Sequence, residues 1–195
     1  MNHHAIYESS RGFDQIGLED ELMKSRKIFL VGPVDANSTN ELIKQLMYLE
    51  SQDNSKEITL YINSPGGCVS DGLAVYDVLR LLDSPIRTVC IGTAASMGAI
   101  LFLAGDKREM LPHTRIMIHD PSFHNYDMSG KKSHEIQIEL DSLNRSKECL
   151  ANIIADRTGH SLDDVYKVTA NDSYYGAKEA IDFGLATNII TKKGA

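Results

Sequence analysis

Residues 58–105, ITLYINSPGGCVSDGLAVYDVLRLLDSPIRTVCIGTAASMGAILFLAG, decide the fold class of this chain. The stretch reads as strand, helix, strand and helix, with expected positions of 58–62, about 70–82, 88–91 and 97–104. Ser70 can cap the first of these helices, and Gly92 is expected to end the second strand. Strands that alternate with helices in this way are typical of βαβ units in a mostly parallel sheet.

The same alternation extends to both sides of this stretch, so we expect one domain over residues 1–195. Further strands are predicted at 27–31 and 115–118, and further helices at 18–23, from Asn37 or Ser38 to Glu50, at about 132–157 and after Ser161. Residues 1–25 are polar and contain Gly12 and Gly17, so we expect a mobile arm before the short helix. The helix at 132–157 could project onto another subunit or pack on its own domain.

Composition limits the classes of function. The chain carries 27 acidic against 20 basic residues and a net charge of −7, which argues against nucleic acid or an anionic membrane as its main partner. Its three cysteines lie far apart and its seven histidines lack zinc-ligand spacing, so we expect free thiols, a reducing compartment and no metal. The sequence shows no secretory signal, long apolar span or ATP-binding glycine loop, so we expect a cytoplasmic protein without a cofactor.

A serine framed by small residues lies where a predicted strand turns into a helix, in Gly92-Thr-Ala-Ala-Ser96-Met-Gly98. Nucleophilic serines need such a tight, exposed turn. The helix that starts at Met97 would direct free backbone N–H groups at an oxyanion beside the hydroxyl. A serine that only caps the helix would show the same pattern, so the motif by itself leaves both roles open.

Two further features fall at the same predicted edge of the sheet. Gly66 and Gly67 follow a strand, where they could present an N–H to a carbonyl oxygen or simply form a sharp turn. His119 ends an apolar strand and could be a general base or a structural residue. Because ligands bind at the carboxyl ends of parallel strands, convergence with Ser96 favours a nucleophile, a base and an oxyanion loop. The carboxylate that would orient the histidine cannot be deduced from spacing, and Asp120 is expected to point to the opposite face of its strand.

Four segments together resemble the proteolytic subunit of the Clp protease (ClpP): YINSPGG at 61–67, GTAASMGA at 92–99, LPHTRIMIH at 111–119 and AKEAIDFGL at 177–185. The resemblance implies a crotonase-like α/β fold of repeated βαβ units, with an N-terminal axial arm at 1–25 and a handle region with a projecting helix at 122–158. It also implies an ATP-dependent protease, in which this chain is a serine endopeptidase that cleaves unfolded polypeptides. The chamber would be a double ring of two stacked heptamers, fed by an AAA+ unfoldase of the ClpX or ClpC type.

The resemblance also assigns residues to roles. Ser96 would be the nucleophile, His119 the base, and Asp172, which precedes the segment Ser-Tyr-Tyr-Gly-Ala-Lys-Glu-Ala, the group that orients the histidine. The backbone N–H groups of Gly67 and Met97 would form the oxyanion hole. A hydrophobic docking pocket for the unfoldase would be formed by Tyr61, Leu81, Val89, Ile91 and Ile190.

The chain departs from the family pattern at three places. Ala170 and Asn171 replace a charged pair that bridges the two rings, and residues 120–124 (DPSFH) replace a glycine-rich segment that pairs with substrate backbone. Thr59 and Glu109 stand at aromatic positions of the docking pocket, where a buried carboxylate would be costly. With these departures, the chain resembles the divergent second copy that some bacteria carry beside a more typical paralogue.

Three functions therefore stay open. The retained Ser96, His119 and Asp172 favour an active compartmentalised peptidase. The departures favour a weakly active or regulatory ring subunit that works in a mixed complex with a typical paralogue. A crotonase-type acyl-CoA enzyme shares the fold and the oxyanion glycines, but such enzymes use acidic residues rather than a Ser-His pair, so it is the least favoured.

Overall fold

The computed structural model describes residues 4–9, 12–123, 127 and 129–191. Within them, the main sheet consists of β3 (Lys27–Val31), β4 (Ile58–Ser64), β5 (Ile86–Ala95), β6 (Lys107–Met110), β7 (Arg115–Ile118), β8 (Ser173–Gly176) and β9 (Asn188–Ile189). The order β3-β4-β5-β6-β9 is parallel throughout. β7 branches off as a parallel partner of β5, and β8 pairs antiparallel with β7. The predicted α/β class with a mostly parallel sheet is confirmed.

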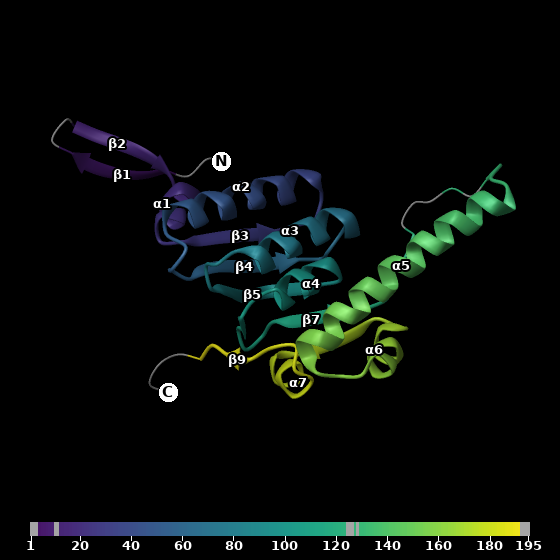
Figure 1. Cartoon of the computed structure of the whole chain (residues 1–195). Coiled ribbons are helices and arrows are strands. Elements are labelled where there is room, and N and C mark those ends of the chain that lie inside the picture. Colours follow the sequence, from purple (N-terminus) through teal and green to yellow (C-terminus); the bar gives the residue numbers. More distant parts are fainter. Residues whose placement is uncertain (1–3, 10–11, 124–126, 128, 192–195) are drawn as a thin grey trace.

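The helices are α1 (Leu18–Lys24), α2 (Ala36–Gln52), α3 (Val69–Leu81), α4 (Met97–Leu103), α5 (Ser133–Thr158), α6 (Leu162–Thr169) and α7 (Ala177–Asp182). Figure 1 shows α2, α3 and α4 side by side over one face of the sheet. Every residue of α4 is buried. The helix that follows Ser96 is therefore fixed by the core of the molecule, and so is the turn that precedes it.

Three predicted boundaries are wrong. β5 does not end at Gly92 but continues to Ala95, because it changes partner along its length from β6 to β7. Asp35, rather than Asn37 or Ser38, caps α2 by accepting the N–H groups of both those residues. The cap position of α3 is Cys68 rather than Ser70, and no side chain bonds to that helix end.

The described part of the expected N-terminal arm forms a hairpin. β1 (His4–Ser9) and β2 (Gly12–Gly17) pair antiparallel, with His4 opposite Gly17 and Ser9 opposite Gly12. Among the described residues, these strands pair only with each other, and the hairpin extends from the body beside α1 (Figure 1). Residues 1–3, 10 and 11 of the expected arm lie outside the described residues.

The helix α5 leaves the body at the other end of the molecule (Figure 1). Its buried residues, Leu150, Ala151 and Ile154, all lie in its last third, where it packs on α4 and α6. Gly159, in the left-handed conformation with φ 80°, ends it. The predicted helix at 132–157 is confirmed within one residue at each end, and it projects from its own subunit.

Candidate active site

The turn at Ser96 joins β5 to α4 in a strained conformation. Ser96 has φ 52° and ψ −123°, and among the described residues Arg26 is the only other non-glycine residue with a positive φ. Its side chain makes no capping hydrogen bond to α4, although it occupies the cap position. The capping alternative therefore does not describe this serine. A strained strand-to-helix turn that exposes the hydroxyl is the geometry that nucleophilic serines use.

His119 lies against this turn because of how β5 and β7 pair. Thr93, Ala94 and Ala95 run parallel to Arg115, Ile116 and Met117, and the N–H of Ser96 donates to the carbonyl of Met117 at 2.9 Å. The residues that follow the two strands are therefore neighbours. His119 Nε2 lies 2.9 Å from Ser96 Oγ, within hydrogen-bonding distance. The imidazole side chain is 25% exposed, so it is shielded on most sides but open to the site.

Asp172 reaches the other nitrogen of the same ring. β8 runs antiparallel to β7 with Ser173 opposite Ile118, which brings the preceding Asp172 to His119. Asp172 Oδ1 lies 3.3 Å from His119 Nδ1. The Asp172 side chain is 58% exposed, whereas the carboxylate of a Ser-His-Asp triad is typically buried. Within this subunit the carboxylate therefore has little packing to hold it in place.

Asp120 is placed as the alternation of a strand requires, away from the Ser96–His119 pair. Its carboxylate accepts a hydrogen bond from Thr169 Oγ1 at 2.6 Å and lies 2.5 Å from Lys147 Nζ. It cannot also orient the imidazole, so Asp172 is the carboxylate that faces His119.

The loop with Gly66 and Gly67 packs directly on the serine turn. Gly66 has φ 91°, and a Cβ built there would meet Ala95 O and Ser96 Cβ, each at 2.6 Å. A Cβ on Gly67 would clash with the carbonyl oxygen of Val34, to which this loop is joined by hydrogen bonds. Glycine is required at both places, because a side chain at Gly66 would press on the serine turn and one at Gly67 would press on Val34.

The backbone N–H groups of Gly67 and Met97 are the expected oxyanion donors beside Ser96. Among the described residues, neither Gly67 N nor Met97 N donates to a protein acceptor. Met97 N belongs to the first turn of α4, where N–H groups lack partners within the helix and favour negative charge.

Asn63 is a supporting residue that sequence reasoning missed. Its Oδ1 accepts the N–H of Thr93 at 3.0 Å and lies where a Cβ on Gly92 would clash. This contact spans the place where the register between β4 and β5 shifts, just before the serine turn. The sequence did show Asn63 before Ser-Pro-Gly-Gly and Gly92 in the next predicted strand. That these two residues are neighbours follows only from the register of the sheet, which the sequence does not reveal.

An open pocket of about 590 Å³ lies over the candidate site, lined by Pro65, Gly66, Gly67, Cys68, Val69, Ser96, Met117, His119, Pro121 and Ser122. Beside it is a smaller, mainly apolar recess of about 20 Å³, formed by residues such as Ile100 and Leu150. Pro121 and Ser122, from the segment that departs from the family pattern, border the larger pocket. His124 of that segment lies outside the described residues.

The expected docking residues lie on β4, at the end of α3, on β5 and just after β9. Tyr61 pairs with Val89 across β4 and β5 and stacks on Phe29, with ring centroids 5.0 Å apart. Leu81 is 82% exposed at the end of α3, whereas Val89 is buried, and Ile91 and Ile190 are partly buried.

The side chains that bind Glu109 offset the expected free-energy cost of burying its carboxylate. Thr59 is buried, and the Glu109 side chain is only 13% exposed. Burial would raise the pKa of Glu109, but hydrogen bonds from Asn188 and Arg87 outweigh it and place that pKa below its ordinary value. The carboxylate is thus paired rather than stranded, and the concern about an uncompensated buried charge is wrong.

No group of three or more His, Cys, Asp or Glu side chains that could hold a metal ion occurs among the residues that the structure describes. In the same part of the chain, no helix combines the length and apolar character needed to cross a membrane. Cys68, Cys90 and Cys149 are free thiols, as expected.

Comparison with known families agrees with the geometry. The Clp protease family model matches residues 10–193, nearly the whole chain, and includes the serine turn, His119 and Asp172. The parallel sheet with its covering helices and the projecting α5 fits the expected crotonase-like, ClpP-type fold. This chain belongs to the Clp protease family and is a proteolytic subunit.

Proposed function

We propose that this subunit hydrolyses peptide bonds with Ser96 as nucleophile, His119 as general base and Asp172 as the group that orients the imidazole. The observation that carries the proposal is the 2.9 Å contact between Ser96 Oγ and His119 Nε2 at a strained strand-to-helix turn. Asp172, 3.3 Å from Nδ1, supports the tautomer in which Nε2 accepts the serine proton.

The reaction follows from these positions. As Ser96 Oγ bonds to the substrate carbonyl carbon, its proton passes to His119 Nε2, and the carbonyl oxygen becomes an oxyanion. The N–H groups of Gly67 and Met97 would donate to that oxygen. The C–N bond then breaks, and the imidazolium gives its proton to the leaving amine. A water molecule, deprotonated by His119, hydrolyses the acyl-enzyme and restores the serine.

The substrate would be an extended, unfolded polypeptide. The pocket over Ser96 is open rather than enclosed, which suits a chain that lies across the site. Members of the Clp protease family generally assemble into rings and work with AAA+ partners. We propose the same here, with two stacked heptamers and an unfoldase that docks near Tyr61 and Leu81. ATP would be used by that partner, and this chain would need no cofactor.

Covalent labelling tests the nucleophile. A fluorophosphonate or β-lactone probe should label the wild type on Ser96, and the Ser96→Ala variant should lose labelling, with turnover falling by several orders of magnitude. Ser70→Ala, which removes an exposed hydroxyl from the nearby start of α3, should label like the wild type. Labelling that persists in Ser96→Ala would refute the assignment.

A regulatory ring subunit is the second candidate, and one feature of the site favours it. The exposed Asp172 follows Ala170 and Asn171, which lack the charges that bridge rings in the family pattern. An exposed ion pair is worth only about 0–1 kcal/mol, but symmetry repeats the loss at every equivalent contact. We therefore expect rings whose double-ring state is weaker or more compact than is typical.

Two measurements separate the candidates. Peptidase activity of the isolated protein would favour the active enzyme, and activity that appears only with a typical paralogue would favour the regulatory subunit. The variant Ala170→Asp/Asn171→Arg should stabilise the double ring in sedimentation velocity and raise peptidase activity. A wild-type double ring that survives dilution unchanged by these substitutions would show that the missing charges do not set assembly.

A further inference from the structure

A polar cluster joins the segment with His119, which follows β7, to the segment with Asp172. Asp120 directly follows His119, and its Oδ1 accepts a hydrogen bond from Thr169 Oγ1 at 2.6 Å. The backbone N–H of Asp120 also donates to the carbonyl oxygen of Thr169 at 2.7 Å. Two hydrogen bonds therefore clamp Asp120 to the C-terminal end of α6. Thr169 is buried, with 2% of its surface exposed, so this end of the clamp is firmly held.

The clamp matters because Asp172 has few contacts of its own. Within the described residues, the contact with His119 is the only hydrogen bond or ion pair of its carboxylate, and the side chain is 58% exposed. Its position must come from the backbone on either side. On one side, Ser173 pairs with β7 and its hydroxyl donates to the carbonyl of Val168 at 2.6 Å. On the other side, three residues before Asp172, stands Thr169.

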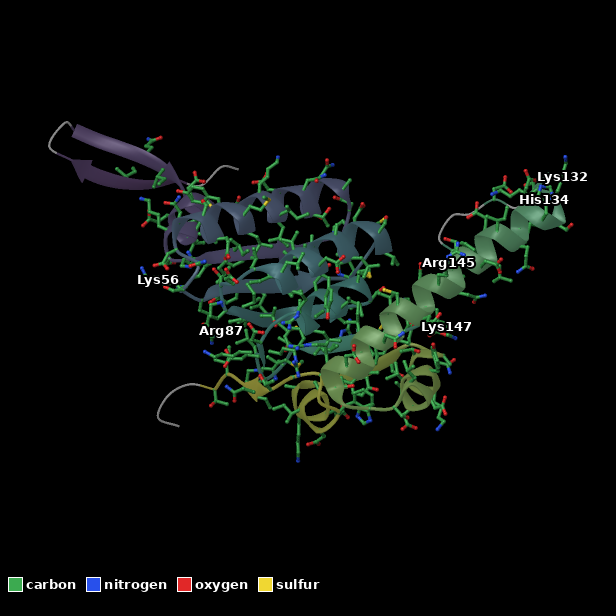
Figure 2. All side chains as sticks on the ribbon, viewed as in Figure 1. Lys56, Arg87, Lys132, His134, Arg145 and Lys147 are labelled. Carbon is green, nitrogen blue, oxygen red and sulfur yellow. The ribbon has the colours of Figure 1, made fainter. Side chains whose placement is uncertain are left out.

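Lys147 connects this clamp to the projecting helix. Its ammonium lies 2.5 Å from Asp120 Oδ2 and 5.3 Å from the centre of the Tyr166 ring on α6. Figure 2 shows Lys147 on the part of α5 near the body, far from Lys132 at the outer end. Lys147 thereby neutralises the charge of Asp120, which is one residue from His119, and holds the carboxylate oxygen that Thr169 does not contact.

We propose that Asp120 is a positioning residue for the serine peptidase site: through Thr169 it fixes the segment that places Asp172 against His119, and through Lys147 it links that placement to α5. Asp120 does not touch the reacting atoms. It is also the first residue of the segment in which this chain departs from the family pattern, so the role belongs to this chain in particular. The proposal rests on the peptidase function proposed above.

A double-mutant cycle on the full-length protein tests it. Asp120→Ala should lower kcat by about 10- to 100-fold, the loss expected when a catalytic group is displaced by up to about 1 Å, and should leave KM nearly unchanged. In an Asp172→Ala background, Asp120→Ala should lower kcat by less than about twofold, because its effect acts through Asp172. Equal losses in both backgrounds would overturn the proposal, since a merely structural role of Asp120 would be additive.

Milder variants keep the test valid if Asp120→Ala folds poorly. Thr169→Val keeps the shape of the side chain and removes the hydroxyl, so it should reproduce most of the loss in kcat. Asp120→Asn keeps an acceptor for Thr169 and loses only the ion pair with Lys147, so it should retain more activity than Thr169→Val. Wild-type kcat in Thr169→Val would overturn the positioning role.

The control separates this proposal from the one on which it rests. Lys167→Met removes a different lysine, which lies on α6 and pairs with the exposed Asp164, and this variant should keep the wild-type kcat. Failure of the wild type to react with a fluorophosphonate at Ser96 would refute the peptidase function. Labelling at Ser96 together with additive losses would refute only the role of Asp120.

Discussion

The contact between Gly66 and the serine turn gives a perturbation whose size can be worked out. In Gly66→Ala, the new methyl group would lie 2.6 Å from Ala95 O and from Ser96 Cβ, and 2.9 Å from Met97 N. Real Cβ atoms do not approach backbone this closely, so the loop or the turn must move. Gly32→Ala is a matched control, because Gly32 has the same φ of 91° but a methyl group added there would meet no atom within 4 Å.

The two variants share one cost and differ in another. The positive φ should cost each of them about 1–2 kcal/mol of unfolding free energy. Gly66→Ala adds a clash with well-packed backbone, which typically costs about 1–3 kcal/mol more. If the loop yields instead of the turn, the neighbouring Gly67 N–H is displaced from the oxyanion position. Loss of one such donor lowers kcat by about 10²- to 10³-fold.

Three measurements on both variants decide the matter: kcat on a fluorogenic peptide, the rate of probe labelling, and unfolding by urea. We expect Gly32→Ala to keep nearly wild-type kcat with a modest loss of stability. We expect Gly66→Ala to lose at least about tenfold in kcat. Equal kcat and equal stability in the two variants would refute the reasoning, because Gly66 would then not be pressed against the nucleophile turn.

Three other predictions follow from the geometry. His119→Ala/Asp172→Asn should have a kcat within about twofold of His119→Ala alone, because the residues act as a unit; multiplied losses in steady-state kinetics would show that Asp172 acts elsewhere. Ser96→Gly should abolish probe labelling yet raise the unfolding free energy by about 1 kcal/mol, since glycine tolerates the φ of 52°, and a lower Tm would contradict this. Burial raises the pKa of Glu109, but its hydrogen bonds lower that pKa more, so the folded value lies below the ordinary one. The ionised Glu109 therefore stabilises the fold fully at pH values above the unfolded pKa. This contribution is lost as the pH falls through the folded pKa. Arg87→Met should therefore destabilise the fold more at pH 7 than at about pH 3, and equal losses in urea unfolding at both pH values would count against the pair.

Local periodicity was enough to predict β3, β4, β5 and β7 and the helices that alternate with them. It also placed Ser96 and His119 at one edge of the sheet, because parallel strands that alternate with helices end on the same side. The pleat correctly placed Asp120 away from the imidazole. Those inferences need only neighbours in sequence and one rule of topology.

The partner of His119 could not be found in the same way. Asp172 faces the imidazole because β8 pairs antiparallel with β7. Neither that pairing nor its register can be predicted from a strand of four residues. Only the family resemblance pointed to Asp172. The extension of β5 past Gly92 was missed for a similar reason, since a change of strand partner is a tertiary event that overrides the turn tendency of a glycine.

The uneven burial of α5 has a consequence for local stability. Its 26 residues form one continuous helix, but only its last third is anchored in the core of the subunit. A helical segment of about a dozen residues that packs on nothing is marginal in water. In a single subunit, the outer turns should therefore open and exchange their amide hydrogens far faster than the turns that hold Leu150 and Ile154. Lys147 lies close to this boundary, so opening of the helix would loosen its outer turns first and reach the ion pair with Asp120 only afterwards.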